Sequence, residues 1–247
     1  MKISKPSKPD DIYANATGRP APFQFNQQVV NVFPDMISRS VPGYDLSLEL
    51  IGLIGQMFVQ PGSSVYDLGC SLGAGIQAMR PFLQTDSCRI IGIDSSEAMV
   101  DQCRANLAKP VGGAPITIDQ ANIKGYPIDN ASLVIMNYTL QFIEQSERQQ
   151  IVNDIYAGLN EGGAFFLSEK VIFSDEKKNS RFIDLHHSYK RMQGYSDLEI
   201  AQKRDAIMNV LVPETIEDHK ARLTQAGFRT AEICLQGINF VSLLAIK

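Results

Sequence analysis

The stretch most suggestive of chemistry is 65–75, which reads VYDLGCSLGAG. A short apolar run containing Asp67 enters a turn with glycines at 69, 73 and 75, and a helical pattern follows. Such a strand, turn and helix bring backbone N–H groups and a positive helix end to a ligand. The spacing departs from GxGxxG, so the turn alone does not decide for a nucleotide site.

A carboxylate follows at a distance that suits a ribose. The run CRIIGIDSS contains Asp94, 25 residues beyond Gly69. A carboxylate there accepts hydrogen bonds from ribose hydroxyls. Alternatively, Asp94 caps the following helix, although Ser95 or Ser96 can also do so. A dinucleotide and S-adenosylmethionine both fit these features. Three observations favour S-adenosylmethionine: the acid Asp67 ahead of the first glycine, a fold with one nucleotide-sized binding half, and the antiparallel hairpin at the end of the chain.

Polar side chains follow the next two predicted strands. The Asn122 amide is placed to pair with the adenine amino group, with Ile123 covering the ring; a turn-forming Asn is the alternative. Asn137 ends the following strand, at the carboxyl edge where ligands bind in such sheets. We expect Tyr138 and Phe142 to pack in the core.

Arg204 lies close to an apolar helical stripe. Ile200, Ile207 and Leu211 share that stripe, and Lys203 is at its flank. The pattern predicts a guanidinium that projects from an apolar face. A buried charge needs a partner. The alternatives are an internal salt bridge, a buried stem with a solvated tip, or a bidentate clamp for a ligand carboxylate.

The order of the predicted strands and helices indicates an α/β fold. Strands and helices alternate from residue 63, which predicts a mostly parallel sheet with helices on both faces. The sheet ends in an antiparallel hairpin that turns at Gly237–Ile238. We expect seven strands, at 63–68, 88–93, 115–119, 131–137, 163–172, 228–236 and 239–246. Helices are expected at 26–38, 45–60, about 73–83, 96–108, 146–159 and 215–226, with two more at 175–193 and 196–211.

We therefore expect one Rossmann-like domain over 23–247, with N-terminal helices and a helical insertion at about 175–211. Prolines and charges predict a flexible N-terminal tail over 1–22.

Composition limits the function classes. The 247 residues carry a net charge of −4, which argues against direct nucleic-acid binding. We expect no membrane span and no bound metal, since apolar runs are short and the four cysteines and three histidines lack ligand spacing. The cysteine pattern favours the reducing cytoplasm.

Several motifs resemble known proteins. DLGCSLGAG, IGIDSS, NYTLQF and GLNEGG look like the class I S-adenosylmethionine-dependent methyltransferase fold over about 45–247. More specifically, NVFPDMISRSVPGY at 31–44 and HHSYKRMQGYSDLEIAQKR at 186–204 resemble the carboxy-S-adenosyl-L-methionine synthase family. That resemblance runs from about residue 29 to the C-terminus.

The resemblance implies an unusual reaction. S-adenosylmethionine and prephenate become carboxy-S-adenosyl-L-methionine and phenylpyruvate. A tRNA uridine carboxymethyltransferase then uses the carboxylated product to make 5-oxyacetyl-uridine at the wobble position of tRNA. By the same resemblance the ligand is lined by Tyr44, Gly69, Cys70, Ser71, Asp94, Ser95, Asn137 and Arg204, with Arg204 gripping the product carboxylate.

The family usually has Asp where this chain has Asn122, which puts the strength of adenine binding in doubt. The resemblance also implies a homodimer, with an apolar stripe of Phe182, Leu185, Tyr189 and Met192 in the insertion. Whether Arg204 serves its own site or its neighbour's stays open. A conventional methyltransferase acting on a small carboxylic acid and a non-catalytic cofactor-binding partner of a tRNA-modifying enzyme are the alternatives.

Overall fold

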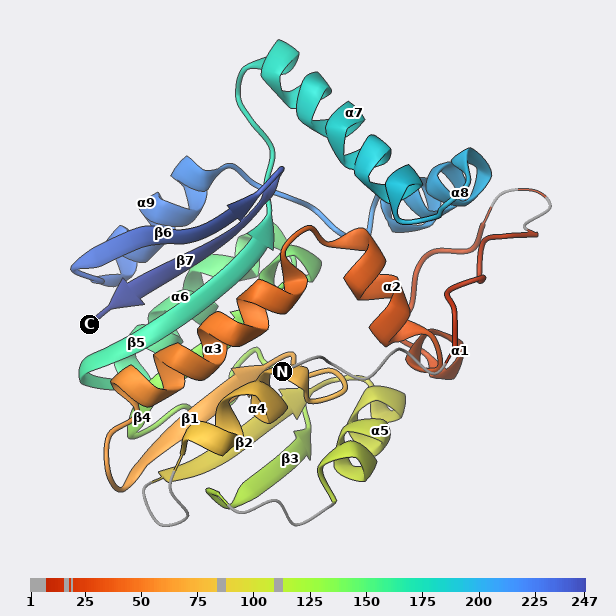
Figure 1. Ribbon diagram of the computed structural model, residues 1–247. Helices are drawn as coiled ribbons and strands as arrows, with labels where there is room; N and C mark the ends of the chain where they lie inside the picture. Colours follow the sequence, from red (N-terminus) through yellow and green to blue (C-terminus); the bar gives the residue numbers. More distant parts are fainter. Residues whose placement is uncertain (1–7, 16–17, 19, 84–87, 109–112) are drawn as a thin grey trace.

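The computed structural model describes residues 8–15, 18, 20–83, 88–108 and 113–247. Seven strands form one sheet in the order β3-β2-β1-β4-β5-β7-β6 (Figure 1). β1 to β5 are parallel, and β7 runs antiparallel to both of its neighbours. The predicted fold class is confirmed. The strands are β1 Ser63–Leu68, β2 Cys88–Asp94, β3 Ile116–Gln120, β4 Ala131–Asn137, β5 Leu159–Lys170, β6 Thr230–Gly237 and β7 Phe240–Ile246.

Successive side chains of a strand point to opposite faces of the sheet, and here both faces carry apolar residues. Helices therefore cover both faces. Val65 of β1 packs in the core beneath α3 (Tyr44–Phe58), α4 (Ala74–Met79) and α5 (Glu97–Leu107). The next residue, Tyr66, packs on the opposite face. The helices there are α6 (Gln145–Gly158) and α9 (Ile216–Ala226). Short 3₁₀ turns, η1 (Arg80–Phe82) and η2 (Leu140–Phe142), follow α4 and β4.

The predicted helix over 26–38 is two helices, α1 (Gln27–Val30) and α2 (Phe33–Ser40). Pro34 lies in the first turn of α2. Its ring removes an N–H and clashes with the preceding turn, so one continuous helix is excluded. The break lets the chain bend around the carboxyl ends of the strands (Figure 1).

Part of the predicted flexible tail is packed. The Asp10 carboxylate accepts a hydrogen bond from the Tyr195 hydroxyl at 2.6 Å, and Arg39 donates to the Asp10 carbonyl at 2.9 Å. Directly after the predicted tail, Phe23 donates its backbone N–H to the Ala206 carbonyl at 2.9 Å. These partners are remote in sequence, so no local pattern reveals them. Residues 1–7, 16–17 and 19 of the predicted tail lie outside the described residues.

The predicted insertion forms α7 (Glu176–Met192) and α8 (Asp197–Ile207), beyond the sheet's carboxyl edge (Figure 1). The hairpin turn lies one residue later than predicted, at Ile238 and Asn239, between β6 and β7. Ile238 has φ +57°, which is uncommon for a β-branched residue.

Candidate functional site

One cavity of about 810 Å³ opens at the carboxyl edge of the sheet. Ligands bind at this edge in open α/β sheets. Every site residue predicted from the sequence lines this cavity, although the predictions came from six separate segments. They are Tyr44, Gly69, Cys70, Ser71, Asp94, Ser95, Asn122, Ile123, Asn137 and Arg204.

The glycine turn presents backbone to the cavity. Gly69 has φ +80°, and a side chain there would collide with Thr139. Ser71 has φ +49°, a conformation that a non-glycine residue seldom adopts away from functional sites. The Cys70 side chain is buried in the core against Cys103, so Cys70 offers mainly its backbone to a ligand.

Asp94 fills both of the roles that the sequence left open. Its Oδ1 accepts the Ser96 N–H at 2.9 Å, and its Oδ2 accepts the Ser71 N–H at 3.0 Å. A carboxylate has about four acceptor positions, so two remain for ribose hydroxyls. Burial raises the pKa of Asp94, while these N–H groups counteract the rise.

Asp67 is a site residue that the sequence analysis used only as a fold indicator. Its side chain lines the cavity and the residue is 3% exposed. Burial, and then the nearby charge of Asp94, raise the pKa of Asp67 to about 7. Two carboxylates therefore flank the turn, and they suit a ligand that carries positive charge.

The amide side chains differ in their environment. The Asn122 Oδ1 accepts the Lys124 N–H at 2.9 Å, the turn arrangement that was the alternative reading, yet Asn122 also lines the cavity. A carbonyl oxygen has a second lone pair, which is free for an adenine amino group. The Asn137 Oδ1 is buried without a hydrogen-bond partner among the described residues. A ligand donor would satisfy it.

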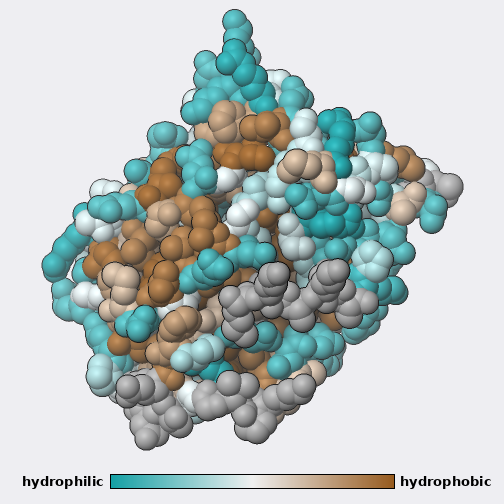
Figure 2. Space-filling model, in the orientation of Figure 1, coloured by the Kyte–Doolittle hydropathy of each residue, from teal (hydrophilic) through white to brown (hydrophobic). Residues whose placement is uncertain are grey.

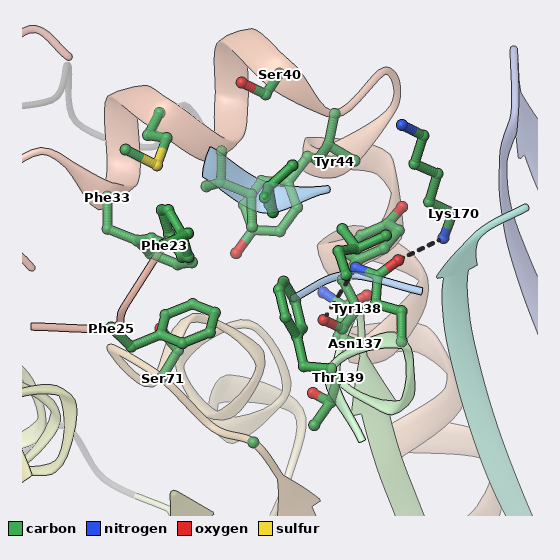
Figure 3. Close-up of a pocket in the computed structure, with 18 of the residues that line it drawn as sticks. Phe23, Phe25, Phe33, Ser40, Tyr44, Ser71, Asn137, Tyr138, Thr139 and Lys170 are labelled. Atoms are coloured by element: carbon green, nitrogen blue, oxygen red, sulfur yellow. Dashed lines mark hydrogen bonds between the residues drawn. The ribbon is translucent and has the colours of Figure 1, made fainter. Parts of the chain in front are cut away.

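An aromatic wall that the sequence analysis missed closes one side of the cavity. Phe25 contacts Phe23 and Phe142 with ring centroids 5.1 Å apart in each pair. Phe33 extends the wall, and Tyr44 and Tyr138 face the cavity from the other side (Figure 3). Tyr138 also has a left-handed φ of +65°. The wall gives this side of the cavity an apolar lining.

The predicted burial of Arg204 is wrong for the isolated chain. Its side chain is 59% exposed and binds the neighbouring Asp205 carboxylate at 3.0 Å, although it lines the cavity. The buried stripe of α8 runs through Lys203 and Ala206 instead. Lys203 lies 3.7 Å from the Asp10 carboxylate. The N-terminal segment supplies this acid, so the helical pattern alone placed the wrong cation inside.

Further basic groups line the same side of the cavity. Lys170 ends β5, and His186, His187 and Lys190 project from α7. Burial is the largest cause that lowers the pKa of each of these groups, to about 3 for His186 and about 7 for Lys190. The cavity thus has a carboxylate-lined half and a basic half.

Among the described residues, no cluster of three or more His, Cys, Asp or Glu side chains is arranged to hold a metal ion. Within the same residues, no helix combines the length and apolar character needed to cross a membrane.

Comparison with known proteins gives concordant results. A family described as methyltransferase domain matches residues 65–163. A carboxy-S-adenosyl-L-methionine synthase of Aliivibrio fischeri strain ES114 is 46% identical over 98% of this chain and 100% of its own length. The synthase of the same name from Escherichia coli O17:K52:H18 is 46% identical over 96% of both chains.

Solved structures share the fold at low identity. Human N-acetylserotonin methyltransferase, crystallised with S-adenosylmethionine, is 17% identical, with a TM-score of 0.59 over 90% of this chain and 55% of its own. A Methanococcus maripaludis protein assigned as an S-adenosylmethionine-dependent methyltransferase is 18% identical, with a TM-score of 0.59 over 94% of this chain and 97% of its own. These two structures show that this chain has the fold of S-adenosylmethionine-dependent methyltransferases.

Proposed function

This chain belongs to the carboxy-S-adenosyl-L-methionine synthase family, and from that premise we propose that its carboxyl donor is prephenate. In this proposal S-adenosylmethionine and prephenate become carboxy-S-adenosyl-L-methionine and phenylpyruvate. The observation that carries the proposal is that one cavity is lined by two neighbouring carboxylates, Asp67 and Asp94, and by a group of neighbouring basic side chains from β5, α7 and α8. The first suits a sulfonium cofactor, and the second suits a carboxylate donor.

The proposed reaction balances without an external base. Prephenate loses its ring carboxylate as carbon dioxide and its ring hydroxyl as hydroxide, and the ring becomes aromatic. Hydroxide then removes a proton from the sulfonium methyl and leaves as water. The resulting ylide carbon forms a bond to carbon dioxide and creates the new carboxylate. A base on the substrate therefore suffices, and no protein side chain needs to take that proton.

The cavity supports this chemistry in two ways. An ylide survives only where water is excluded, and the wall of Phe23, Phe25 and Phe142 provides such a lining. Arg204 lines the same cavity and carries a permanent charge for the new carboxylate. We propose that Arg204 holds that carboxylate, with its solvent exposure in the single chain reduced by a second protomer.

Mass spectrometry of the reaction tests the proposal. The protein is incubated with S-adenosylmethionine with and without prephenate, and the nucleoside product is weighed. A product heavier than the cofactor by one carbon dioxide, formed only with prephenate, supports it. Methyl transfer to an added carboxylic acid would indicate a conventional methyltransferase. Tight cofactor binding without either product would indicate a non-catalytic partner of a tRNA-modifying enzyme.

We also propose that the protein is a homodimer. Within the predicted stripe Leu185 is 51% exposed and Met192 is 74% exposed, while Phe182 packs on Phe173 with centroids 4.6 Å apart. Figure 2 shows hydrophobic residues gathered on the face that carries α3, where Met57 is also exposed. Exposed apolar area of this kind favours a partner surface. A monomer in light scattering at micromolar concentration, with full activity, contradicts the dimer.

The remaining parts of the proposal concern the fate of the product. Carboxy-S-adenosyl-L-methionine is an activated carboxymethyl donor, and we propose a tRNA uridine carboxymethyltransferase in the cytoplasm as its consumer. The net charge of −4 favours handing over the small product rather than binding tRNA directly. Adding such an enzyme and tRNA that carries 5-hydroxyuridine at the wobble position, and looking for 5-oxyacetyl-uridine whose formation depends on prephenate, tests this step.

A further inference from the structure

The basic half of the cavity contains two lysines that the proposed chemistry has not yet used. Lys170 is the last residue of β5, and Lys190 lies on α7. Both line the cavity. In Figure 3 the Lys170 side chain lies on the opposite side of the view from Ser71 of the glycine turn.

Neither of these two lysines has an ion-pair partner in the part of the chain that the structure describes. Neither amine has an ion pair or hydrogen bond there, whereas the neighbouring Lys203 has both Asp10 and the Ser40 hydroxyl. Lys190 and Lys170 lie close enough to repel each other. Burying unpaired charge is costly, so a fold that keeps both lysines is arranged for a ligand with negative charge.

The other titratable groups nearby do not neutralise this charge. The charge of Asp10 acts on Lys190, but the Asp10 carboxylate pairs with Lys203 and accepts a hydrogen bond from the Tyr195 hydroxyl. His186 is bonded to the Ser40 carbonyl at 2.8 Å and adds no negative charge. Asp45 also lines the cavity, but its side chain belongs to an exposed residue and makes no ion pair with either lysine among the described contacts.

We propose that Lys170 and Lys190 form a carboxylate subsite that holds the 2-oxo-acid end of the second substrate. This inference rests on the proposed function, in which that substrate is a dicarboxylate. One carboxylate must reach the sulfonium methyl and leave as carbon dioxide, so it cannot be the group that anchors the molecule. The other carboxylate persists in the product keto acid. Gripping it orients the departing carboxylate toward the cofactor and retains the donor until transfer is complete.

The subsite makes an unusual prediction about stability. A lysine that serves the fold through an ion pair destabilises the protein when it is removed. Lys170 and Lys190 instead repel each other in a partly buried setting. Replacing either by methionine, which keeps much of the stem, should raise the melting temperature of the ligand-free protein while weakening binding of the keto acid.

The test uses Lys170→Met, Lys190→Met and the matched control Lys177→Met, an exposed lysine of α7 outside the cavity. The protein is saturated with S-adenosylhomocysteine, and phenylpyruvate is titrated by calorimetry. We expect the affinity for phenylpyruvate to fall by about tenfold or more in each cavity variant, the loss of one charge-assisted hydrogen bond. The control and the affinity for S-adenosylhomocysteine should stay within about twofold of wild type.

Three outcomes are decisive. If either cavity variant weakens the binding of S-adenosylhomocysteine as much as that of phenylpyruvate, the lysines hold the amino-acid carboxylate of the cofactor. The proposed subsite is then wrong. Unchanged phenylpyruvate affinity with a lower melting temperature makes them structural and also overturns it. If wild type makes no carboxylated product from prephenate, yet phenylpyruvate binds and needs both lysines, the subsite stands and the proposed function fails.

Discussion

The two halves of the cavity are opposite in charge and different in construction. The cofactor half is built on the ends of β1, β2 and β4, with Asp67 and Asp94 beside the glycine turn. The basic half is built on α7 and α8, with Lys170 contributed by the end of β5. A reaction that joins a sulfonium to a carboxylate needs both charges in one cavity. Among the described ion pairs, none joins Asp67 or Asp94 to a basic side chain of the cavity.

The difference in construction has a physical consequence. The cofactor half depends on backbone geometry that the sheet fixes, such as the left-handed Gly69 and the Ser71 N–H bound to Asp94. The basic half depends on long-range contacts, such as those between Asp10 and Lys203. We therefore expect substitutions in the first half to change stability and cofactor affinity together. Substitutions in the second half should change selectivity for carboxylates.

The largest expected effect comes from Gly69→Ala. A left-handed alanine costs about 1–2 kcal/mol, and the collision with Thr139 adds about 1–3 kcal/mol. Gly62→Ala is the matched control, because Gly62 has a similar φ of +74° but no atom within 4 Å of the added Cβ. Urea unfolding should show the larger loss of unfolding free energy for Gly69→Ala. Equal losses would mean that the turn is not tightly packed.

Asp94→Ala should weaken the binding of S-adenosylmethionine by about 1.5–3 kcal/mol, the cost of losing hydrogen bonds to a charged group. The substitution also leaves the Ser71 N–H without its acceptor. Asp101→Ala, an exposed acid on α5, is the control. Calorimetry that finds the same affinity for wild type and Asp94→Ala would remove Asp94 from the ribose role.

The affinity for S-adenosylmethionine should rise with pH. Because burial raises the pKa of Asp67 to about 7, this group is half protonated near neutrality and becomes charged at higher pH. The charged form attracts the cationic cofactor, so affinity should increase about tenfold from about pH 6 to about pH 8. Asp67→Asn should flatten this dependence. A dependence that persists unchanged in Asp67→Asn assigns it to another group.

The same residue predicts a stability effect of opposite sign. A carboxyl whose folded-state pKa is raised stabilises the fold fully only at acidic pH, and that contribution is lost as the pH rises through about 7. Asp67→Asn should therefore raise the melting temperature at about pH 8 while lowering cofactor affinity. Lower stability of Asp67→Asn at this pH would show that the Asp67 carboxylate is satisfied within the fold.

Asn122→Asp should have the smallest effect. A carboxylate accepts the adenine amino group more strongly than an amide does, and the gain is about 0.5–1 kcal/mol at this exposed position. The Lys124 N–H that Asn122 now accepts can remain bonded to the aspartate. A modest rise in affinity for S-adenosylmethionine in calorimetry, with unchanged melting temperature, is expected. Weaker binding would indicate that the Asn122 amide donates to the ligand.

The sequence predicted the cofactor half better than the basic half. Gly69, Asp94 and Asn137 occupy fixed positions at strand ends, where the strand pattern alone determines that their segments meet. Lys170 and Lys190 look like ordinary solvated charges in the sequence, and only the tertiary fold encloses them. On α8 the sequence pattern predicted that Arg204 is buried, whereas the structure buries Lys203. The reason is one remote acid, Asp10, which pairs with Lys203.

The most direct test of the two-half account compares the affinities of S-adenosylmethionine and carboxy-S-adenosyl-L-methionine for wild type and Arg204→Ala. Arg204 lines the basic half, and plain S-adenosylmethionine lacks the carboxylate on the sulfonium methyl that Arg204 is proposed to hold. Arg204→Ala should therefore lose about 1.5–3 kcal/mol of binding free energy for the carboxylated ligand and almost none for S-adenosylmethionine. Arg204→Lys should recover part of the loss, since an ammonium lacks the planar fork. Equal weakening of both ligands by Arg204→Ala would contradict the account and make Arg204 a structural residue.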